Sequence, residues 1–160
     1  MILIGLGANL PGPAGQPAGT LKHALGKLDS KGIKIRDVSS FYETAAWPDP
    51  ADPAFVNAVA RVETDLQPVE LLALLHGVET ALGRLRSVPN APRALDLDLL
   101  DYDGRVMDGK LVLPHPRMTE RSFVLVPLGE IAPGWRHPVS GKGVAELLAA
   151  LPDRDAPKRL

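Results

Sequence analysis

The most informative stretch of the sequence reads Pro92-Arg93-Ala94-Leu95-Asp96-Leu97-Asp98-Leu99-Leu100. Side chains alternate between the two faces of a β-strand, so the alternating leucines point to one face and both aspartates to the other. Asp is a poor strand former, and two of them in a leucine-rich strand need a reason beyond folding. A Mg²⁺ ion, which prefers hard oxygen ligands, supplies that reason, and we favour it over the alternative of a strand face simply exposed to water.

Apolar periodicity around this stretch predicts an alternation of strands and helices. Strands are expected over 2–6, 33–42, 55–62 and 95–102, and Asp103-Gly104 is typical of a hairpin turn. Helices are expected over 21–28, 68–82 and 144–151, and after Thr119 with an interruption near Pro127. Paired strands with helices between them predict one α+β domain over 1–160, with a largely antiparallel sheet and a frayed tail over 152–160.

Composition limits the class of function. The 160 residues are 45% hydrophobic and 23% charged, which suits a globular domain of ordinary size. A net charge of −1 gives no general attraction to nucleic acid or to an anionic membrane, and no apolar run is long enough to span a bilayer. There is no cysteine, which excludes disulfides and thiolate metal sites. The lack of cysteine suits a cytoplasmic protein, and the N-terminus lacks the basic region of a signal peptide. We also expect a monomer.

Basic side chains flank the aspartate strand in the sequence. Arginine forks bind phosphate oxygens in pairs, and cations beside two carboxylates suit a metal–polyphosphate complex. The alternative is a set of surface salt bridges. The segment 87–92 contains two prolines and is expected to be a mobile loop that closes over bound substrates. The basic residues concerned are Arg84, Arg86, Arg93, Lys110, His115, Arg117 and Arg121.

Histidine 115 stands between two prolines, which hold the backbone extended. Its ring can donate a hydrogen bond to a phosphate or a ribose. The alternative is a structural histidine, since a lone histidine more often has that role.

Two further motifs suit a flat ligand. The run from Gly5 to Leu10 begins like a dinucleotide fingerprint, but Leu10 stands where the third glycine belongs, so a Rossmann site is rejected. A glycine at a strand end permits close backbone approach to a ligand, or simply forms a tight turn. Phe55 and Asn57 share a strand face, where a ring can stack on a heterocycle and an amide can pair with it. The alternative for this pair is a core Phe and a turn-facing Asn.

In this order, the motifs resemble the family of 6-hydroxymethyl-7,8-dihydropterin pyrophosphokinases of folate synthesis. The resemblance covers residues 5–133, and its most specific pieces are 92–100 and Leu113-Pro114-His115-Pro116-Arg117-Met118, with support from 39–44 and 55–58. It implies a three-layer α/β/α fold with a ferredoxin-like core. It also implies attack of the dihydropterin hydroxyl on the β-phosphorus of ATP, which gives AMP and the pterin diphosphate.

The resemblance implies roles for individual residues as well. Asp96 and Asp98 would hold two Mg²⁺ ions and, with Arg86 and Arg93, form the catalytic group. ATP would contact His76, Glu79, Arg84, Arg86, Arg93, Leu99, Lys110, His115 and Arg121. Dihydropterin would contact Gly7, Thr44, Ala45, Trp47, Phe55, Asn57 and Phe123, with its ring between the two phenylalanines.

The chain departs from the family pattern in the expected lid. Asn90-Ala91 stands where Trp-Gly is common, and Ala94 stands where Thr is usual. Closure would therefore depend mainly on contacts between arginines and phosphate.

Two other classes of function compete with the kinase. An RNA-binding module on a ferredoxin-like sheet needs exposed aromatic residues and a basic face, whereas aromatics are 4% of this chain. A regulatory domain that binds a nucleotide without reacting is the second, and formation of AMP would separate it from the enzyme.

Overall fold

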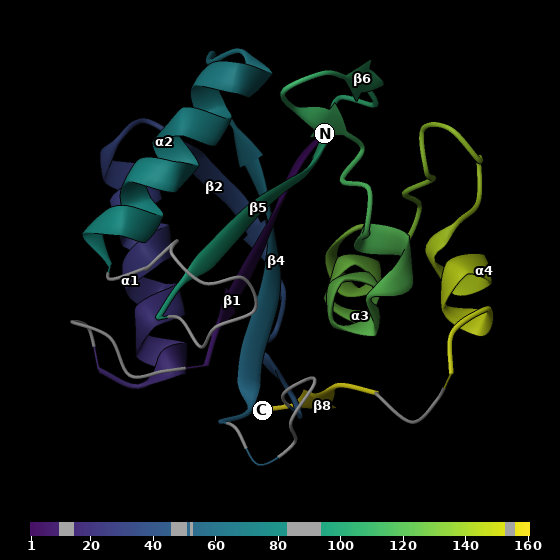
Figure 1. Ribbon diagram of the computed structural model, residues 1–160, viewed down its shortest axis with the longest axis horizontal. Helices are drawn as coiled ribbons and strands as arrows, with labels where there is room; N and C mark the ends of the chain where they lie inside the picture. The colour runs from purple at the N-terminus through teal and green to yellow at the C-terminus, as the bar shows by residue number, and fades with distance from the viewer. Residues whose placement is uncertain (10–14, 46–50, 52, 83–93, 153–155) are drawn as a thin grey trace.

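The computed structural model describes residues 1–9, 15–45, 51, 53–82, 94–152 and 156–160. A six-stranded sheet, antiparallel at every pairing among these residues, forms the middle layer of the molecule (Figure 1). Its strands are β1 (Ile2–Ala8), β2 (Lys34–Val38), β3 (Tyr42–Thr44), β4 (Phe55–Glu63), β5 (Asp96–Tyr102) and β8 (Lys158–Arg159).

Helices cover both faces of the sheet. One face carries α1 (Pro17–Ser30) and α2 (Pro68–Ala81), and the other carries α3 (Ser122–Ile131) and α4 (Val144–Ala149), as Figure 1 shows. This arrangement confirms the predicted α+β class with three layers. No helix among the residues that the structure describes is both long and apolar enough to cross a membrane.

The strand order is β5-β1-β4-β3-β8, and β2 also pairs with β4. The four strands β1, β2, β4 and β5 therefore lie in the order β5-β1-β4-β2. In this order α1 connects β1 to β2 across β4, and α2 connects β4 to β5 across β1. This is the ferredoxin-like arrangement that the resemblance implied.

Each face of the sheet buries its own hydrophobic core. Alternate residues of β4 and β5 pack against α1 and α2, namely Val56, Ala58, Ala60, Val62, Leu97 and Leu99. The opposite face contributes Leu3, Val59 and Leu100 to a second core with α3 and α4. Because side chains alternate, the first core leaves Asp96 and Asp98 on the face that α3 covers.

The sequence-based prediction was wrong about Pro127. Helix α3 continues through this residue from Ser122 to Ile131 instead of breaking there. The proline cannot donate a backbone hydrogen bond. Val124, Leu125 and Leu128 around it are buried in the second core, and this packing offsets the missing bond.

The tail was also predicted wrongly, because part of the range expected to fray is a strand. Lys158 and Arg159 form β8, which pairs with Glu43 and Tyr42 of β3. The N–H of Leu160 donates to the carbonyl of Phe41 at 2.9 Å. Strand β3 would otherwise present unpaired backbone groups at the edge of the sheet, and the tail satisfies them.

The predicted turn after β5 is present, with φ of 52° at Asp103 and 71° at Gly104. The short strands that follow, β6 (Met107–Asp108) and β7 (Val112–Leu113), pair with each other in a separate two-stranded sheet. The Asp103-Gly104 signal therefore located the turn correctly, but the strand that follows it, β6, pairs with β7 and not with β5.

Candidate active site

One row of residues crosses the sheet on the face that α3 covers. From β5 to β8 the residues in register are Asp96, Gly7, Asn57, Tyr42 and Arg159. Residues directly opposite each other in antiparallel strands share a face. The row therefore places the predicted metal ligand and the predicted pterin amide on one face, with only a glycine between them.

Gly7 makes room for the side chain of Asn57. A Cβ atom at position 7 would lie 2.7 Å from Oδ1 of Asn57. Asn57 is buried, and its Nδ2 donates to Oγ1 of Thr44 at 3.3 Å. The sequence left two interpretations of this glycine open, close approach of a ligand and a tight turn. The structure shows close approach by the neighbouring amide.

Asp98 lies in the next row of the same face, opposite Gly5. Nη1 of Arg121 is 3.6 Å from its Oδ2, and Nε2 of His115 is 3.8 Å from its Oδ1. The structure thus brings together three residues that the sequence assigned to metal and ATP.

His115 is neutral at pH 7. Burial, followed by the charge of Arg121, lowers the pKa of this imidazole to about 4, although Asp96 acts in the opposite direction. Nδ1 accepts the backbone N–H of Arg117 at 3.2 Å, so the neutral ring carries its proton on Nε2. The contact with Asp98 is therefore polar rather than an ion pair, and Nε2–H is a donor directed into the site.

The two carboxylates fit a Mg²⁺ site of an open kind. Asp96 and Asp98 are partly buried on one face, and the residues opposite them in β1 are glycines without side chains. Within the described ranges no group of three or more His, Asp or Glu residues could hold a metal ion. Mg²⁺ commonly takes one or two carboxylates and completes its shell with water and phosphate oxygens. The donor set suits a metal–phosphate complex better than a closed protein cage.

Helix α2 reaches the same strand from the opposite face. Glu79 is fully buried, and its Oε2 accepts the backbone N–H of Leu97 at 3.0 Å, between the two aspartates. His76 lies one helical turn earlier and is partly buried. The side chain of Leu99 is in the core, so only its backbone can contact a ligand. Glu79 therefore holds α2 to β5 in addition to any contact with ATP.

Two residues predicted to hold the pterin lie next to Asn57: Gly7 is opposite it, and Thr44 accepts its hydrogen bond. Thr44 and Phe55 are opposite each other in register, and Ala45 follows at the exposed end of β3. Phe123 lies in the first turn of α3, and the guanidinium carbon of Arg121 is 5.6 Å from its ring centroid.

Other predicted residues lie farther out or outside the described ranges. Lys110 is exposed in the turn between β6 and β7. Trp47, the arginines Arg84, Arg86 and Arg93, and the expected lid over 87–92 all lie outside the described residues.

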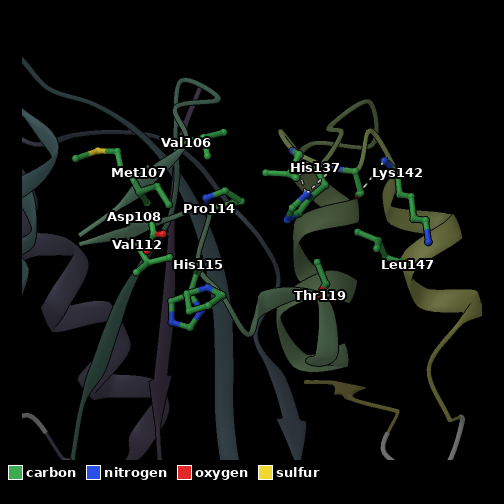
Figure 2. Close-up of a pocket in the computed structure, with 14 residues that line it drawn as sticks. Val106, Met107, Asp108, Val112, Pro114, His115, Thr119, His137, Lys142 and Leu147 are labelled. Carbon is green, nitrogen blue, oxygen red and sulfur yellow. Dashed lines mark hydrogen bonds between the residues drawn. The ribbon is translucent and has the colours of Figure 1, made fainter. Parts of the chain in front are cut away.

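A cavity of about 490 Å³ adjoins the candidate site, between the β6–β7 hairpin and the segment 137–142 (Figure 2). His115 lines it from below the hairpin, and His137 and Lys142 line it from the opposite wall. Neither Asp96 nor Asp98 does so. The cavity is therefore a neighbour of the carboxylate site, and no motif in the sequence predicted it.

A protein-family model described as 7,8-dihydro-6-hydroxymethylpterin-pyrophosphokinase (HPPK) matches residues 3–133. The chain belongs to the HPPK family. This confirms the family and the class of enzyme, an ATP-dependent diphosphokinase, that the motifs resembled.

Curated relatives and solved structures agree with this assignment. The 2-amino-4-hydroxy-6-hydroxymethyldihydropteridine pyrophosphokinase of Methylorubrum extorquens is 41% identical over 149 residues, which cover 92% of this chain and 91% of the relative. The folic acid synthesis protein fol1 of Pneumocystis carinii is 38% identical over 96% of this chain, which spans only 20% of that longer protein. A Plasmodium falciparum HPPK-DHPS structure has a TM-score of 0.69 at 15% identity, and the matched region covers 92% of this chain and 43% of the Plasmodium chain. The last match supports the fold alone.

The motifs did not reveal the role of three residues in this HPPK-family site. Glu130 of α3 accepts hydrogen bonds from Ser40 and Tyr42, and Tyr42 stands beside Asn57 in the row described above. Contact with a residue 88 positions away left no local signal.

Proposed function

We propose that this HPPK-family chain transfers pyrophosphate from ATP to the hydroxymethyl group of 6-hydroxymethyl-7,8-dihydropterin, releasing AMP, as a step of folate synthesis. The observation that carries the proposal is the row of Asp96, Gly7 and Asn57. It places an acidic strand end beside a buried amide, in a chain whose family match spans residues 3–133.

The phosphate part of the proposed site is built around β5. Asp96 and Asp98 would hold two Mg²⁺ ions, which would withdraw charge from the phosphoryl oxygens. Arg121 and the neutral His115 lie within 4 Å of Asp98 and are placed to donate hydrogen bonds to the same phosphates. The neutral ring of His115 can still donate, because its proton is on Nε2.

Further contacts with ATP follow from the family pattern. His76, Glu79 and the backbone of Leu99 lie along α2 and β5, and Lys110 lies on the adjacent hairpin. Three arginines complete the set: Arg84, Arg86 and Arg93. They supply charge to the triphosphate, and Arg86 and Arg93 act with the two aspartates in catalysis.

The pterin part of the proposed site is built around Asn57. Its amide pairs with polar edges of the ring, assisted by Thr44, Ala45, Trp47 and the backbone of Gly7. Phe55 and Phe123 hold the two ring faces. Phe55 lies on the β4 face that α3 covers, and Phe123 lies in the first turn of α3, so the two elements that carry these rings face each other.

The chemistry that these residues perform is mainly positioning. The hydroxyl attacks the β-phosphorus while AMP leaves on the opposite side, and the barrier falls when both substrates are aligned and the developing charge is met by fixed donors. Asp96 or Asp98 accepts the hydroxyl proton indirectly.

The test is incubation of the protein with ATP, Mg²⁺ and 6-hydroxymethyl-7,8-dihydropterin, followed by separation of nucleotides. AMP formed in step with the pterin diphosphate supports the proposal, and ADP contradicts it. Nucleotide binding without any product supports the regulatory alternative. The monomeric state and the cytoplasmic location remain predictions, and sedimentation of the purified chain tests the first.

A further inference from the structure

We propose that Glu130 is a positioning residue for dihydropterin: through Ser40 and Tyr42 it fixes strand β3, so that Thr44 holds Asn57 in its binding orientation. The inference rests on the proposed function and deepens it. Glu130 lies on α3, and it is not among the residues that the family pattern assigns to substrate binding.

The carboxylate of Glu130 accepts three hydrogen bonds from one short segment. Oε2 accepts the backbone N–H of Ser40 at 2.8 Å and its hydroxyl at 3.0 Å. Oε1 accepts the hydroxyl of Tyr42 at 2.6 Å. A single side chain from the helical layer thus ties down the chain immediately before and inside β3.

Strand β3 needs such an anchor because it is only three residues long. A strand of this length makes few ladder hydrogen bonds. Tyr42 is opposite Asn57, and Thr44, two residues along the same face, accepts the hydrogen bond from the Asn57 amide. A shift of β3 would therefore move the acceptor that orients Asn57.

The electrostatics keep Glu130 in its accepting form. Burial alone would raise the pKa of its carboxyl, but hydrogen bonds from Tyr42 and Ser40, together with the charge of Arg159, hold the pKa below its usual value. The bond to Glu130 in turn raises the pKa of Tyr42, so its hydroxyl remains a donor. At neutral pH the carboxylate accepts and the phenol donates.

Strand β8 fixes β3 from its outer edge. Arg159 is opposite Tyr42, and this strand lies beyond the 3–133 range of the family match. The three-residue strand is therefore bounded by β4 on one side, β8 on the other and Glu130 from α3. Of these restraints, the carboxylate is the one that a single near-isosteric substitution weakens, because glutamine replaces one of its two acceptor oxygens with an NH2 donor.

The test compares Glu130→Gln, Tyr42→Phe and the double variant with Glu43→Gln, a control on β3 whose side chain is exposed. Initial rates give KM for dihydropterin and KM for ATP separately. We expect the KM for dihydropterin to rise about 2- to 10-fold in each variant, the range that one net hydrogen bond allows. The KM for ATP and the rates of Glu43→Gln should stay at wild-type values.

The double variant separates positioning from additive damage. Tyr42 and Glu130 share one hydrogen bond, and either substitution disrupts it. The KM of the double variant for dihydropterin should therefore be no higher than the higher of the two single-variant values. Equal rises in both KM values, or a lower melting temperature with an unchanged KM for dihydropterin, would overturn the inference while leaving the enzyme assignment intact. A wild-type protein that forms no AMP would instead overturn the proposed function.

Discussion

Replacement of Gly7 by alanine should weaken pterin binding while sparing the fold. The added Cβ would lie 2.7 Å from Oδ1 of Asn57, closer than real Cβ contacts come. The next atoms are more distant, Cγ of Asn57 at 3.8 Å and the carbonyl of Val56 at 4.0 Å. Only the far end of one side chain must move, so rotation of Asn57 relieves the clash without displacing a strand.

That rotation has a calculable effect on binding. The amide leaves its bond to Thr44 and no longer meets the ring, and the polar groups left unpaired cost about 1–3 kcal/mol. At about 1.4 kcal/mol for each tenfold change, the Kd for dihydropterin should rise by about 5- to 150-fold. Asn57→Ala should give a similar rise, because both substitutions remove the same contact.

Calorimetry with a pterin and, separately, with a non-hydrolysable ATP analogue measures the two affinities. Gly5→Ala is the matched control, since it lies on the same strand and face but its Cβ would meet Leu100 side-chain atoms at 3.5 Å, an ordinary contact. We expect Gly5→Ala to bind the pterin normally, and Gly7→Ala to lose far more affinity for the pterin than for the ATP analogue. Normal pterin binding by Gly7→Ala, or an equal loss in Gly5→Ala, would refute the reasoning.

Three other predictions follow from single side chains. Asp96→Asn and Asp98→Asn should each reduce turnover by orders of magnitude at saturating Mg²⁺ while the protein still folds, because loss of one charge weakens the metal site but also relieves carboxylate repulsion. Near-normal turnover in either variant would contradict the metal assignment. In the metal-free protein, NMR should show His115 titrating near pH 4 rather than near 6.5. Between pH 6.5 and about pH 4 the unfolded chain therefore binds more protons than the folded protein, so the free energy of unfolding falls as the pH drops. This fall should be less steep in His115→Gln. Trp135→Phe should lower the free energy of unfolding, measured by urea denaturation, by about 1–3 kcal/mol, because Asp101 loses a buried donor. The KM values for dihydropterin and ATP should stay unchanged.

The sequence predicted the layers of this fold because burial leaves a periodic trace in each element. The alternation in β4 and β5 matches the two cores, and the Pro68 that opens α2 is also its first residue. Partners distant in the chain left no such trace. Pairing of β8 with β3 depends on a free edge that exists only after β3 has joined β4. The continuation of α3 through Pro127 likewise depends on packing that no local propensity records.

The site could be predicted to the same extent and for the same reason. Parity along one strand correctly paired Asp96 with Asp98 and Phe55 with Asn57. It could not show that the two pairs belong to one face of one sheet, since that depends on the register of β5, β1 and β4. The resemblance supplied this link as a pattern, and the register gives its physical form.

Asp101 shows where parity stops being a guide to function. Counting by twos from Asp96 and Asp98 puts Asp101 on the opposite face, but a register shift in the β1–β5 ladder places Asp101 opposite Leu3, on the α3 side. There it is buried, accepts the indole N–H of Trp135 at 2.8 Å and the backbone N–H of Gly104 at 3.0 Å. Three aspartates of one strand thus share a face. Asp101 is buried with its two donors, whereas Asp96 and Asp98, which lie opposite glycines, are partly exposed. The strand's irregularity therefore divides a structural carboxylate from the two proposed to hold metal.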